Sequence, residues 1–301
     1  MFEKATRKRS RLRLALCGSA GSGKTYTALT IAKELGQRVA VLDTERGSAS
    51  KYADRFDFDV VELSNYHPRK YVEVINAAES GGYDVLIIDS LTHAWSGKGG
   101  ALELVDQASA RSKSRNSFAA WREVTPLHNE LVDAILGSGV HIIVTMRSKT
   151  EYVLEDNGKG GKVPRKIGMA PVQRDGMEYE FDCVADMDQA HTMVVTKSRI
   201  PEIADAVIKE PGAKFAKTVA KWVGVGVEPP PPKPKELTAE GLRAILVTRM
   251  QAGKWDQKQA QDLIFTYGVE LADDLNQEQR REIAGILTKK TGQEWAAEVS
   301  K

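Results

Sequence analysis

The sequence predicts an α/β protein with a mainly parallel sheet flanked by helices, followed by a small all-helical C-terminal domain. Three observations support this fold class. A glycine-rich segment at residues 18–25 stands between a short apolar strand and a helix. Buried-type strands then alternate with helical segments, which is the order that gives a parallel, doubly wound sheet. Finally, a proline-rich stretch at residues 229–234 precedes a region that carries only helix signals.

The glycine-rich segment matches the phosphate-binding pattern G-x-x-x-x-G-K-[ST] without departure. Its glycines let the backbone curl so that successive N–H groups face phosphate oxygens, and the helix that follows adds the positive end of its dipole. We expect Lys24 to reach the β- and γ-phosphates and the Thr25 hydroxyl to hold Mg²⁺. The nucleotide-binding residues predicted for this segment are Gly18, Ser19, Ala20, Gly21, Ser22, Gly23, Lys24, Thr25 and Tyr26. The guanine-specific signature N-K-x-D is absent from the sequence, which favours ATP.

Long apolar runs, typical of strands buried on both faces, occupy residues 38–43, 83–90 and 141–146. Because the carboxyl ends of parallel strands share one edge of the sheet, we expect Glu45, Asp89 and Arg147 at the ligand-binding edge. An aspartate that follows a hydrophobic run typically holds the Mg²⁺ of phosphate-loop enzymes. Asp89 is therefore predicted to hold the metal together with Thr25. The alternative is that Asp89 only caps the next turn.

The remaining pattern of the core is less regular. A helix is predicted at residues 126–136, and further strands are predicted at residues 181–187 and 191–196. Between them, residues 148–176 predict a long loop with a hairpin-like or flexible tip. A loop of this length in a compact domain is usually functional or disordered.

One large and one small domain are expected, since 301 residues with 42% hydrophobic side chains supply a sizeable core. The predicted divisions are a basic arm at 1–13, a core at 14–226, a proline-rich linker at 227–236 and a helical domain at 237–301. The arm is either a solvated tail or a contact for nucleic acid or a neighbouring subunit. The helix caps and capping boxes expected in the helical domain are Thr238, Asp256, Asn276 with Gln279, and Thr291 with Glu294.

Composition limits the possible surroundings and partners. The net charge of +2 is nearly neutral, so any affinity for nucleic acid has to come from local basic clusters. Cys17 and Cys183 have neither a disulfide framework nor a metal-ligand spacing and are expected to be core thiols in a reducing cytosol. No apolar run approaches the roughly 20 residues needed to cross a bilayer. We therefore expect a cytoplasmic protein without a membrane partner.

The strand end Leu42-Asp43-Thr44-Glu45-Arg46-Gly47-Ser48 and the strand end at Asp89 resemble the RecA-like recombinase core. Within that group, the sequence is similar to the phage ATPases described as RecA-like single-strand annealing proteins, over about residues 10–210. The resemblance implies a RecA-like P-loop NTPase fold in which Glu45 activates the attacking water. It also implies that Tyr52, seven residues after Glu45, binds the nucleotide by stacking on adenine. As alternatives, Glu45 could pair with Arg46 at the surface and Tyr52 could simply belong to the core.

Two further basic positions follow from the resemblance. Lys197 and Arg199 are similar to the basic pair that these ATPases place against the γ-phosphate of a neighbouring subunit. Such a pair would make hydrolysis depend on oligomers, because the charge that stabilises the transition state comes from another protomer. The two side chains alternate along a predicted strand and face one side of it, so a solvated face is the alternative.

One departure concerns the strand that ends in Met146-Arg147, where the recombinases usually carry an Asn-Gln pair. Their glutamine senses the γ-phosphate. An arginine is always charged and makes bidentate contacts to phosphate, so Arg147 could do the same sensing. The alternative for Arg147 is a salt bridge at the strand end, without the relay of ATP binding to DNA that the recombinases use.

The loops after the strands that end in Asp89 and Arg147 correspond to those with which the recombinases contact DNA. They combine basic side chains with aromatic ones such as Phe118 and Trp121, which suits the phosphates and unstacked bases of a single strand. The predicted DNA-binding residues are Lys98, Arg111, Lys113, Arg115, Lys159, Lys162, Arg165 and Lys166. The second loop is also rich in acidic residues, so a merely solvated loop is the alternative.

Phe2 and Ala5 form an F-x-x-A pattern, by which eukaryotic and archaeal recombinases dock on the next protomer. These two residues are therefore predicted at an oligomer interface. The alternative is that the pattern arose by chance, because only two of its positions are fixed.

The sequence and its resemblance together predict an ATPase that binds ATP and Mg²⁺, forms rings or filaments and binds single-stranded DNA for annealing or homologous recombination. DNA is expected to stimulate hydrolysis, and the location would be the host cytoplasm if the chain is phage-encoded. The C-terminal domain could bind a single-strand-binding protein, a nuclease or DNA, or only stabilise the core. Alternative functions are an ATP-switched DNA-binding scaffold with negligible turnover, a helicase-type motor or loader, and a small-molecule kinase.

Overall fold

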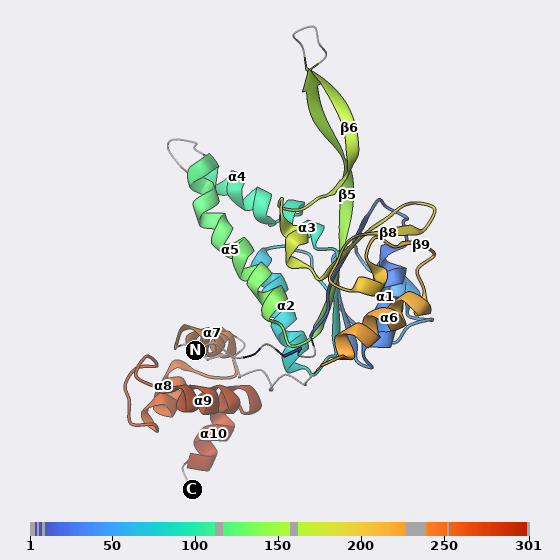
Figure 1. The fold of residues 1–301 in the computed structure, drawn as a ribbon. Coiled ribbons are helices and arrows are strands. Elements are labelled where there is room, and N and C mark those ends of the chain that lie inside the picture. Colours follow the sequence, from blue (N-terminus) through green and yellow to red (C-terminus); the bar gives the residue numbers. More distant parts are fainter. Residues whose placement is uncertain are drawn as a thin grey trace. The chain divides into compact units, whose positions relative to one another are not determined.

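The computed structural model describes residues 4, 6–7, 10–111, 117–156, 162–226, 239–251 and 253–299 (Figure 1). The side chains of residues 117, 150–156, 162–168, 240, 244, 248, 251 and 288 are not described. The chain divides into two compact units, Met1–Pro229 and Pro230–Lys301. The first unit is α/β with a mainly parallel sheet, and the described part of the second is helical, so the predicted fold class is confirmed.

The sheet of the first unit has the strand order β3-β2-β4-β5-β1-β7-β8-β9. Its pairs from β3 to β7 are parallel, while β8 and β9 are added antiparallel at one side. The strands are β1 (Arg13–Gly18), β2 (Val39–Asp43), β3 (Asp59–Glu62), β4 (Val85–Asp89), β5 (His141–Asp156), β7 (Cys183–Met187), β8 (Thr192–Ser198) and β9 (Val207–Lys209). The edge strand β3 was not predicted, because all four of its residues are exposed and it lacks an apolar run.

Both faces of the sheet are covered, as the continuous apolar strands require. Side chains that alternate along each strand enter two separate cores, so Ile87 packs on one side and Ile88 on the other. Helices α1 (Lys24–Leu35) and α6 (Ala213–Gly224) cover the first face, and α2 (Pro68–Ser80) and α5 (Ser117–Gly137) cover the second (Figure 1). Both predicted core thiols, Cys17 and Cys183, are buried and unpaired.

The predicted loops contain more regular structure than their sequences suggested. Beyond Arg147, β5 continues and pairs antiparallel with β6 (Lys162–Pro171), so that a long hairpin projects from the sheet (Figure 1). The first loop contains α3 (Thr92–Ser96) and α4 (Ala101–Arg111). α4 packs on α5 through a small core with helical spacing, made of Ala101, Val105, Ala108, Ala120 and Val124. The sequence analysis predicted a loop here and missed these helices, because glycines and charges obscured this short apolar period.

Two basic residues that were assigned to the N-terminal arm contact the core instead. Arg13 begins β1 and is buried, and its guanidinium donates hydrogen bonds to four carbonyls, including those of Val140 and Ser138. Arg7 donates to the Trp222 carbonyl at 3.0 Å and stacks over the Trp222 ring. Arg13 is therefore part of the sheet, and Arg7 lies on α6 of its own chain.

The second unit has its own apolar core, formed by four helices in the described part of the chain. They are α7 (Ala239–Gln251), α8 (Gln257–Phe265), α9 (Gln277–Lys289) and α10 (Gly292–Val299). The capping boxes predicted at Asn276 and Thr291 are present, and Asp256 caps α8 in the same way with Gln259. Trp255 and Trp295 pack together in the core of this unit. Thr238 lies outside the described residues.

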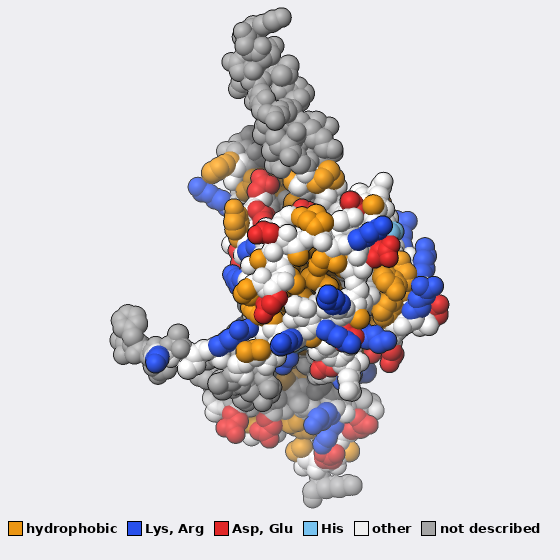
Figure 2. All heavy atoms as spheres, turned by 45° about the vertical axis from the view of Figure 1, so that its right-hand side comes forward, with side chains coloured by type: hydrophobic (Ala, Val, Ile, Leu, Met, Phe, Trp, Pro, Cys, Tyr) orange, Lys and Arg blue, Asp and Glu red, His pale blue; other side chains and the backbone are white. Residues whose placement is uncertain are grey.

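The surface carries mixed charge. On the face in Figure 2, basic and acidic side chains are interspersed and form no patch of a single sign. Among the described residues, the helices are all too short or too polar to span a bilayer.

Acid is expected to destabilise the first unit through His141, a buried residue at the start of β5 whose Nδ1 accepts a hydrogen bond from Leu12 N at 2.9 Å. Burial, with the charges of Arg11 and Arg13, lowers the pKa of His141 from 6.5 to about 4. Between these values the unfolded chain binds the additional proton, so the free energy of unfolding falls as the pH drops. We expect His141 to account for about 3 kcal/mol of this loss between pH 7 and pH 4.

Urea unfolding at several pH values would measure this contribution. His141→Asn is the matched variant, because its amide oxygen can accept the Leu12 hydrogen bond without titrating. Its free energy of unfolding should depend less steeply on pH than that of the wild type. Equal slopes would show that His141 is not the responsible group.

Candidate functional site

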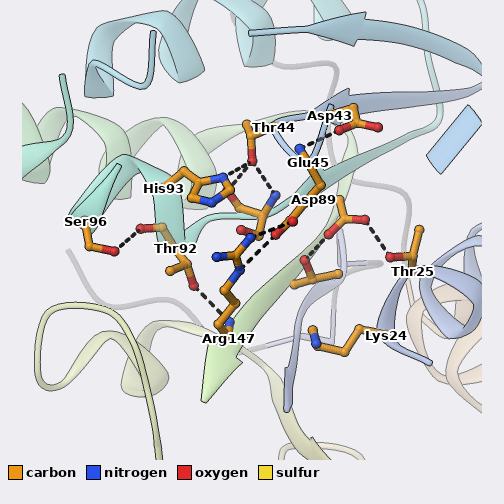
Figure 3. Close-up of polar contacts among 12 residues, drawn as sticks. Lys24, Thr25, Asp43, Thr44, Glu45, Asp89, Thr92, His93, Ser96 and Arg147 are labelled. Carbon is orange, nitrogen blue, oxygen red and sulfur yellow. Dashed lines mark hydrogen bonds and ion pairs between the residues drawn. The ribbon is translucent and has the colours of Figure 1, made fainter. Parts of the chain in front are cut away.

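The predicted site residues meet at the carboxyl edge of the parallel strands. In the sheet register, Gly18 of β1 lies opposite Arg147 of β5, and Asp43 of β2 lies opposite Asp89 of β4. Residues from four neighbouring strand ends therefore surround the start of α1 (Figure 3). This is the edge at which doubly wound sheets bind their ligands.

The phosphate loop has the backbone that its glycines allow. Gly21 and Gly23 have φ values of 78° and 91°, in the left-handed region that other residues rarely adopt. A Cβ atom on Gly18 would lie 2.3 Å from the carbonyl oxygen of Met187, so only glycine fits there. Lys24 Nζ lies within this curl and donates hydrogen bonds to the carbonyls of Gly18 and Ser19 at 3.0 and 2.8 Å. Burial lowers the pKa of Lys24.

Thr25 and Asp89, the two predicted metal residues, are in direct contact. Thr25 Oγ1 donates a hydrogen bond to Asp89 Oδ2 at 2.7 Å, and Thr145 Oγ1 donates to Asp89 Oδ1 at 2.5 Å. Burial raises the pKa of Asp89, and the hydrogen bonds from Thr145 and Thr25 oppose that rise. Among the described residues no cluster of three or more His, Cys, Asp or Glu could hold a metal alone. This donor set fits Mg²⁺, which takes one or two protein ligands together with phosphate oxygens and water.

Glu45 and Arg147 form a bidentate ion pair across the site. Arg147 Nη2 lies 2.6 Å from Glu45 Oε2, and Arg147 Nε lies 3.1 Å from Glu45 Oε1 (Figure 3). Partial burial favours the neutral acid, but the hydrogen bonds and charge of Arg147 outweigh it and lower the pKa of Glu45. The partner of Glu45 is thus Arg147 and not its sequence neighbour Arg46.

Four polar side chains that sequence reasoning missed support this arrangement. Thr44 Oγ1 lies 2.7 Å from His93 Nδ1 and accepts a hydrogen bond from Ser90 N at 2.8 Å, which ties the ends of β2 and β4 together. Thr92 Oγ1 accepts from Arg147 N at 2.9 Å, and Thr145 holds Asp89. Burial and the charge of Arg147 lower the pKa of His93, so its ring is neutral at neutral pH. In the sequence, only the position of these four residues beside the predicted strand ends could have indicated their role.

A pocket of about 750 Å³ adjoins the phosphate loop and contains both predicted aromatic nucleotide contacts. Tyr26, Tyr52 and Phe56 line it together with Gly21 and Gly23. The Tyr26 ring lies edge-on to the other two, at centroid distances of 5.8 Å from Tyr52 and 5.4 Å from Phe56. Tyr52 also packs against the apolar core, which was the alternative to a nucleotide contact, and its stacking on adenine stays a prediction.

Lys197 and Arg199 lie away from this site within one chain. Lys197 pairs with Val184 at the start of β7, whereas Met187 at the other end of β7 lies beside Gly18. Lys197 Nζ donates to the carbonyls of Glu178 and Tyr179 at 3.1 and 2.6 Å, and Arg199 forms an ion pair with Asp182 at 2.9 Å. Any contact of this pair with a γ-phosphate therefore requires a second subunit.

The predicted DNA residues are only partly described. Lys98 is exposed after α3, and Arg111 ends α4 in an exposed ion pair with Glu123 at 3.7 Å. Lys162, Arg165 and Lys166 lie on β6 without described side chains. The remaining predicted DNA residues and the predicted interface residues lie outside the described residues, namely Lys113, Arg115, Lys159, Phe2 and Ala5.

A phosphate loop, a threonine and an aspartate in contact at the metal position, and strand ends that converge on them define a P-loop NTPase. The family model described as AAA domain matches residues 10–216, and the chain belongs to this family. No curated protein matches the chain. The predicted P-loop NTPase class is therefore confirmed and nucleotide binding follows from it, while the closer kinship with recombination ATPases stays a prediction.

Proposed function

We propose that this protein hydrolyses ATP, assembles with further copies of itself and binds single-stranded DNA during annealing or homologous recombination. The observation that carries the proposal is the cluster of Lys24, Thr25, Asp89, Glu45 and Arg147 at one sheet edge. It combines phosphate-binding, metal-binding and water-activating groups in one place. A site that binds a nucleotide without hydrolysing it has no need of a water-activating group.

Each residue has a distinct task in the proposed reaction. Lys24 would turn from the loop carbonyls to the β- and γ-phosphates, and Thr25 and Asp89 would hold Mg²⁺, which would supply positive charge against the developing phosphate charge. Glu45 orients the attacking water and accepts its proton, because a glutamate side chain is ionised at neutral pH. Arg147 contacts the γ-phosphate. Positioning and charge neutralisation supply most of the rate, as is usual in phosphoryl transfer.

Support for adenine comes from the aromatic pocket beside the phosphate loop. Tyr26, Tyr52 and Phe56 offer an apolar surface to a flat base, and Gly21 and Gly23 bring that base close to the loop. Assembly into oligomers is supported by the position of Lys197 and Arg199. Both residues lie away from the nucleotide site of their own chain, so they would act at the nucleotide site of a neighbouring subunit. Single-stranded DNA is proposed from the resemblance to annealing ATPases and from the exposed basic residues Lys98 and Arg111.

Steady-state ATP hydrolysis with and without single-stranded DNA tests this function. We expect DNA to accelerate the wild type, and Lys24→Ala to reduce hydrolysis to background with or without DNA. Lys70→Ala is the matched control, since Lys70 is exposed on α2 and pairs with Glu73. It should hydrolyse ATP as the wild type does.

The outcomes separate the alternatives. If DNA does not change the rate of hydrolysis and the protein does not bind DNA at low salt, the DNA assignment is contradicted. This result would favour a small-molecule kinase. Binding and annealing without measurable hydrolysis would favour the ATP-switched scaffold. DNA-dependent unwinding of a duplex would favour a motor.

A further inference from the structure

His93 lies beside the ion pair of the nucleotide site, although the reaction described above gives it no task. It is the second residue of α3, and its ring is next to the Glu45–Arg147 pair in Figure 3. The charges of Arg147 and Glu45 both act on the pKa of His93, and the charge of His93 in turn acts on the pKa of Glu45. The imidazole is therefore a near neighbour of both charged groups.

Two contacts fix the position of the His93 ring. Nδ1 lies 2.7 Å from Thr44 Oγ1, and the ring stacks on Tyr66 with centroids 4.8 Å apart and planes 26° apart. Tyr66 is anchored in turn, because its hydroxyl donates to the Thr44 carbonyl at 3.2 Å. A ring that is held at one nitrogen and on one face keeps a single orientation. Such a group can position a reacting neighbour without first having to be ordered itself.

The contact at Nδ1 decides which ring nitrogen carries the proton. Thr44 Oγ1 accepts a hydrogen bond from Ser90 N at 2.8 Å, and its own hydrogen can go either to His93 Nδ1 at 2.7 Å or to the Ser90 carbonyl at 3.3 Å. We assign it to the shorter contact. The neutral ring then accepts at Nδ1 and carries its hydrogen on Nε2. Nε2 has no side-chain partner among the described residues, so its N–H is available to a group that moves toward it.

We propose that His93 is a positioning residue for hydrolysis, whose Nε2–H takes over one oxygen of Glu45 when Arg147 turns to the γ-phosphate. This inference rests on the proposed function, because it concerns the base of that reaction. It explains why a neutral ring stands beside an ion pair that has to open. The proton of the attacking water still goes to Glu45, and His93 stays neutral throughout.

The exchange of partners suits the chemistry of a base. While Arg147 is bound to Glu45, both carboxylate oxygens are occupied and a positive charge reduces their basicity. A neutral imidazole holds one oxygen in place, leaves the other to the attacking water and takes away less of its basicity. A carboxylate without any partner would be free to turn away from the water.

Two variants of His93 separate this task from a purely structural one. His93→Asn keeps an acceptor for Thr44 near the position of Nδ1 but has no donor at the position of Nε2. His93→Gln places its amide N–H₂ near the position of Nε2 and gives up the contact with Thr44. His93→Asn should slow single-turnover ATP hydrolysis by about 10- to 100-fold, the usual weight of a hydrogen bond to a charged group. His93→Gln should recover most of that rate, and both variants should bind a non-hydrolysable ATP analogue as the wild type does.

Two further measurements complete the test. In the Glu45→Gln background, His93→Asn should cause no further loss of rate, because no base is left to hold. His67→Asn is the matched control: His67 caps α2 by accepting from Arg69 N at 3.2 Å, which asparagine also does, so hydrolysis should be unchanged.

Several results would overturn the role of His93 and leave the proposed function intact. They are a full rate in His93→Asn, a loss in His93→Gln that equals or exceeds the loss in His93→Asn, and an undiminished effect of His93→Asn in the Glu45→Gln background. Weaker binding of the ATP analogue in His93→Asn, by the same factor as the loss of rate, would also overturn it. Absence of hydrolysis in the wild type would instead contradict the proposed function, and this role with it.

Discussion

Glu45→Gln is expected to slow ATP hydrolysis by at least about 100-fold while ATP still binds, because the amide cannot accept a proton from the attacking water. The change is nearly isosteric. The amide oxygen can still accept a hydrogen bond from Arg147, so the site should keep its shape. Single-turnover hydrolysis and equilibrium binding of a non-hydrolysable ATP analogue would separate the two effects.

Two outcomes would be informative beyond the rate itself. An unchanged rate constant would show that Glu45 is not the base and would leave it as the structural partner of Arg147. Annealing that persists at full rate in the slow variant would show that ATP binding, and not its hydrolysis, supports DNA work. Asp43 is not a useful control, since its carboxylate holds the backbone N–H groups of Glu45 and Ala49.

Arg147→Ala is expected to lower the rate of hydrolysis by about 100-fold, the usual cost of removing one group that stabilises developing charge. It should also remove most of the difference in affinity between an ATP analogue and ADP. The reason is that Arg147 must exchange Glu45 for the γ-phosphate, a group that ADP lacks. In the free protein the ion pair occupies both side chains, with 2.6 Å between Nη2 and Oε2. In the proposed mechanism, binding of a triphosphate would free Glu45 for the attacking water.

Two further variants test this role of Arg147 more specifically. Arg147→Lys keeps the charge but loses the bidentate contact of the planar guanidinium, so it should recover only part of the rate. Arg46→Ala removes an exposed arginine next to Glu45 in the chain and should hydrolyse ATP normally. Equal losses of affinity for ADP and the ATP analogue in Arg147→Ala would mean that Arg147 binds nucleotide without sensing the γ-phosphate.

Arg147 is also connected by hydrogen bonds and ring packing to segments outside the nucleotide site. Its backbone N–H is held by Thr92 at the start of α3, and Trp95 of α3 stacks on Trp121 of α5. Gln173, which follows the β5–β6 hairpin, donates to the carbonyl of Leu91 at 3.1 Å. The segment that follows Asp89 is therefore bonded to both α5 and the residues after the hairpin.

Much of the site was predictable because it depends on short-range order. The spacing of glycines and Lys24-Thr25 between a strand and a helix is sufficient to identify a phosphate loop, and an apolar run that ends in Asp89 is sufficient to place a carboxylate at the strand end. Parallel strands then bring such ends to one edge of the sheet. The capping boxes at Asn276 and Thr291 were equally visible, since each involves residues three positions apart.

Helix α4, the first half of α5 and the strand β3 were not predicted, for physical reasons that differ. The apolar residues between α4 and α5 are small and few, so their helical period is weak beside the surrounding charges. β3 is an exposed edge strand whose position depends on hydrogen bonds to β2 and not on buried side chains of its own.

By itself, the sequence determined the class of fold, the phosphate loop and the identity of the groups at the strand ends, because these depend on neighbours in the chain. Only the tertiary structure decided which of those groups meet. Glu45 and Arg147 are 102 positions apart, whereas Lys197 and Arg199 bond to groups away from the site. The hollow lined by Trp95, Trp121 and Lys149 likewise exists only where α3, α5 and the hairpin base come together. Long-range contacts of this kind are set by packing of whole elements, which no local pattern records.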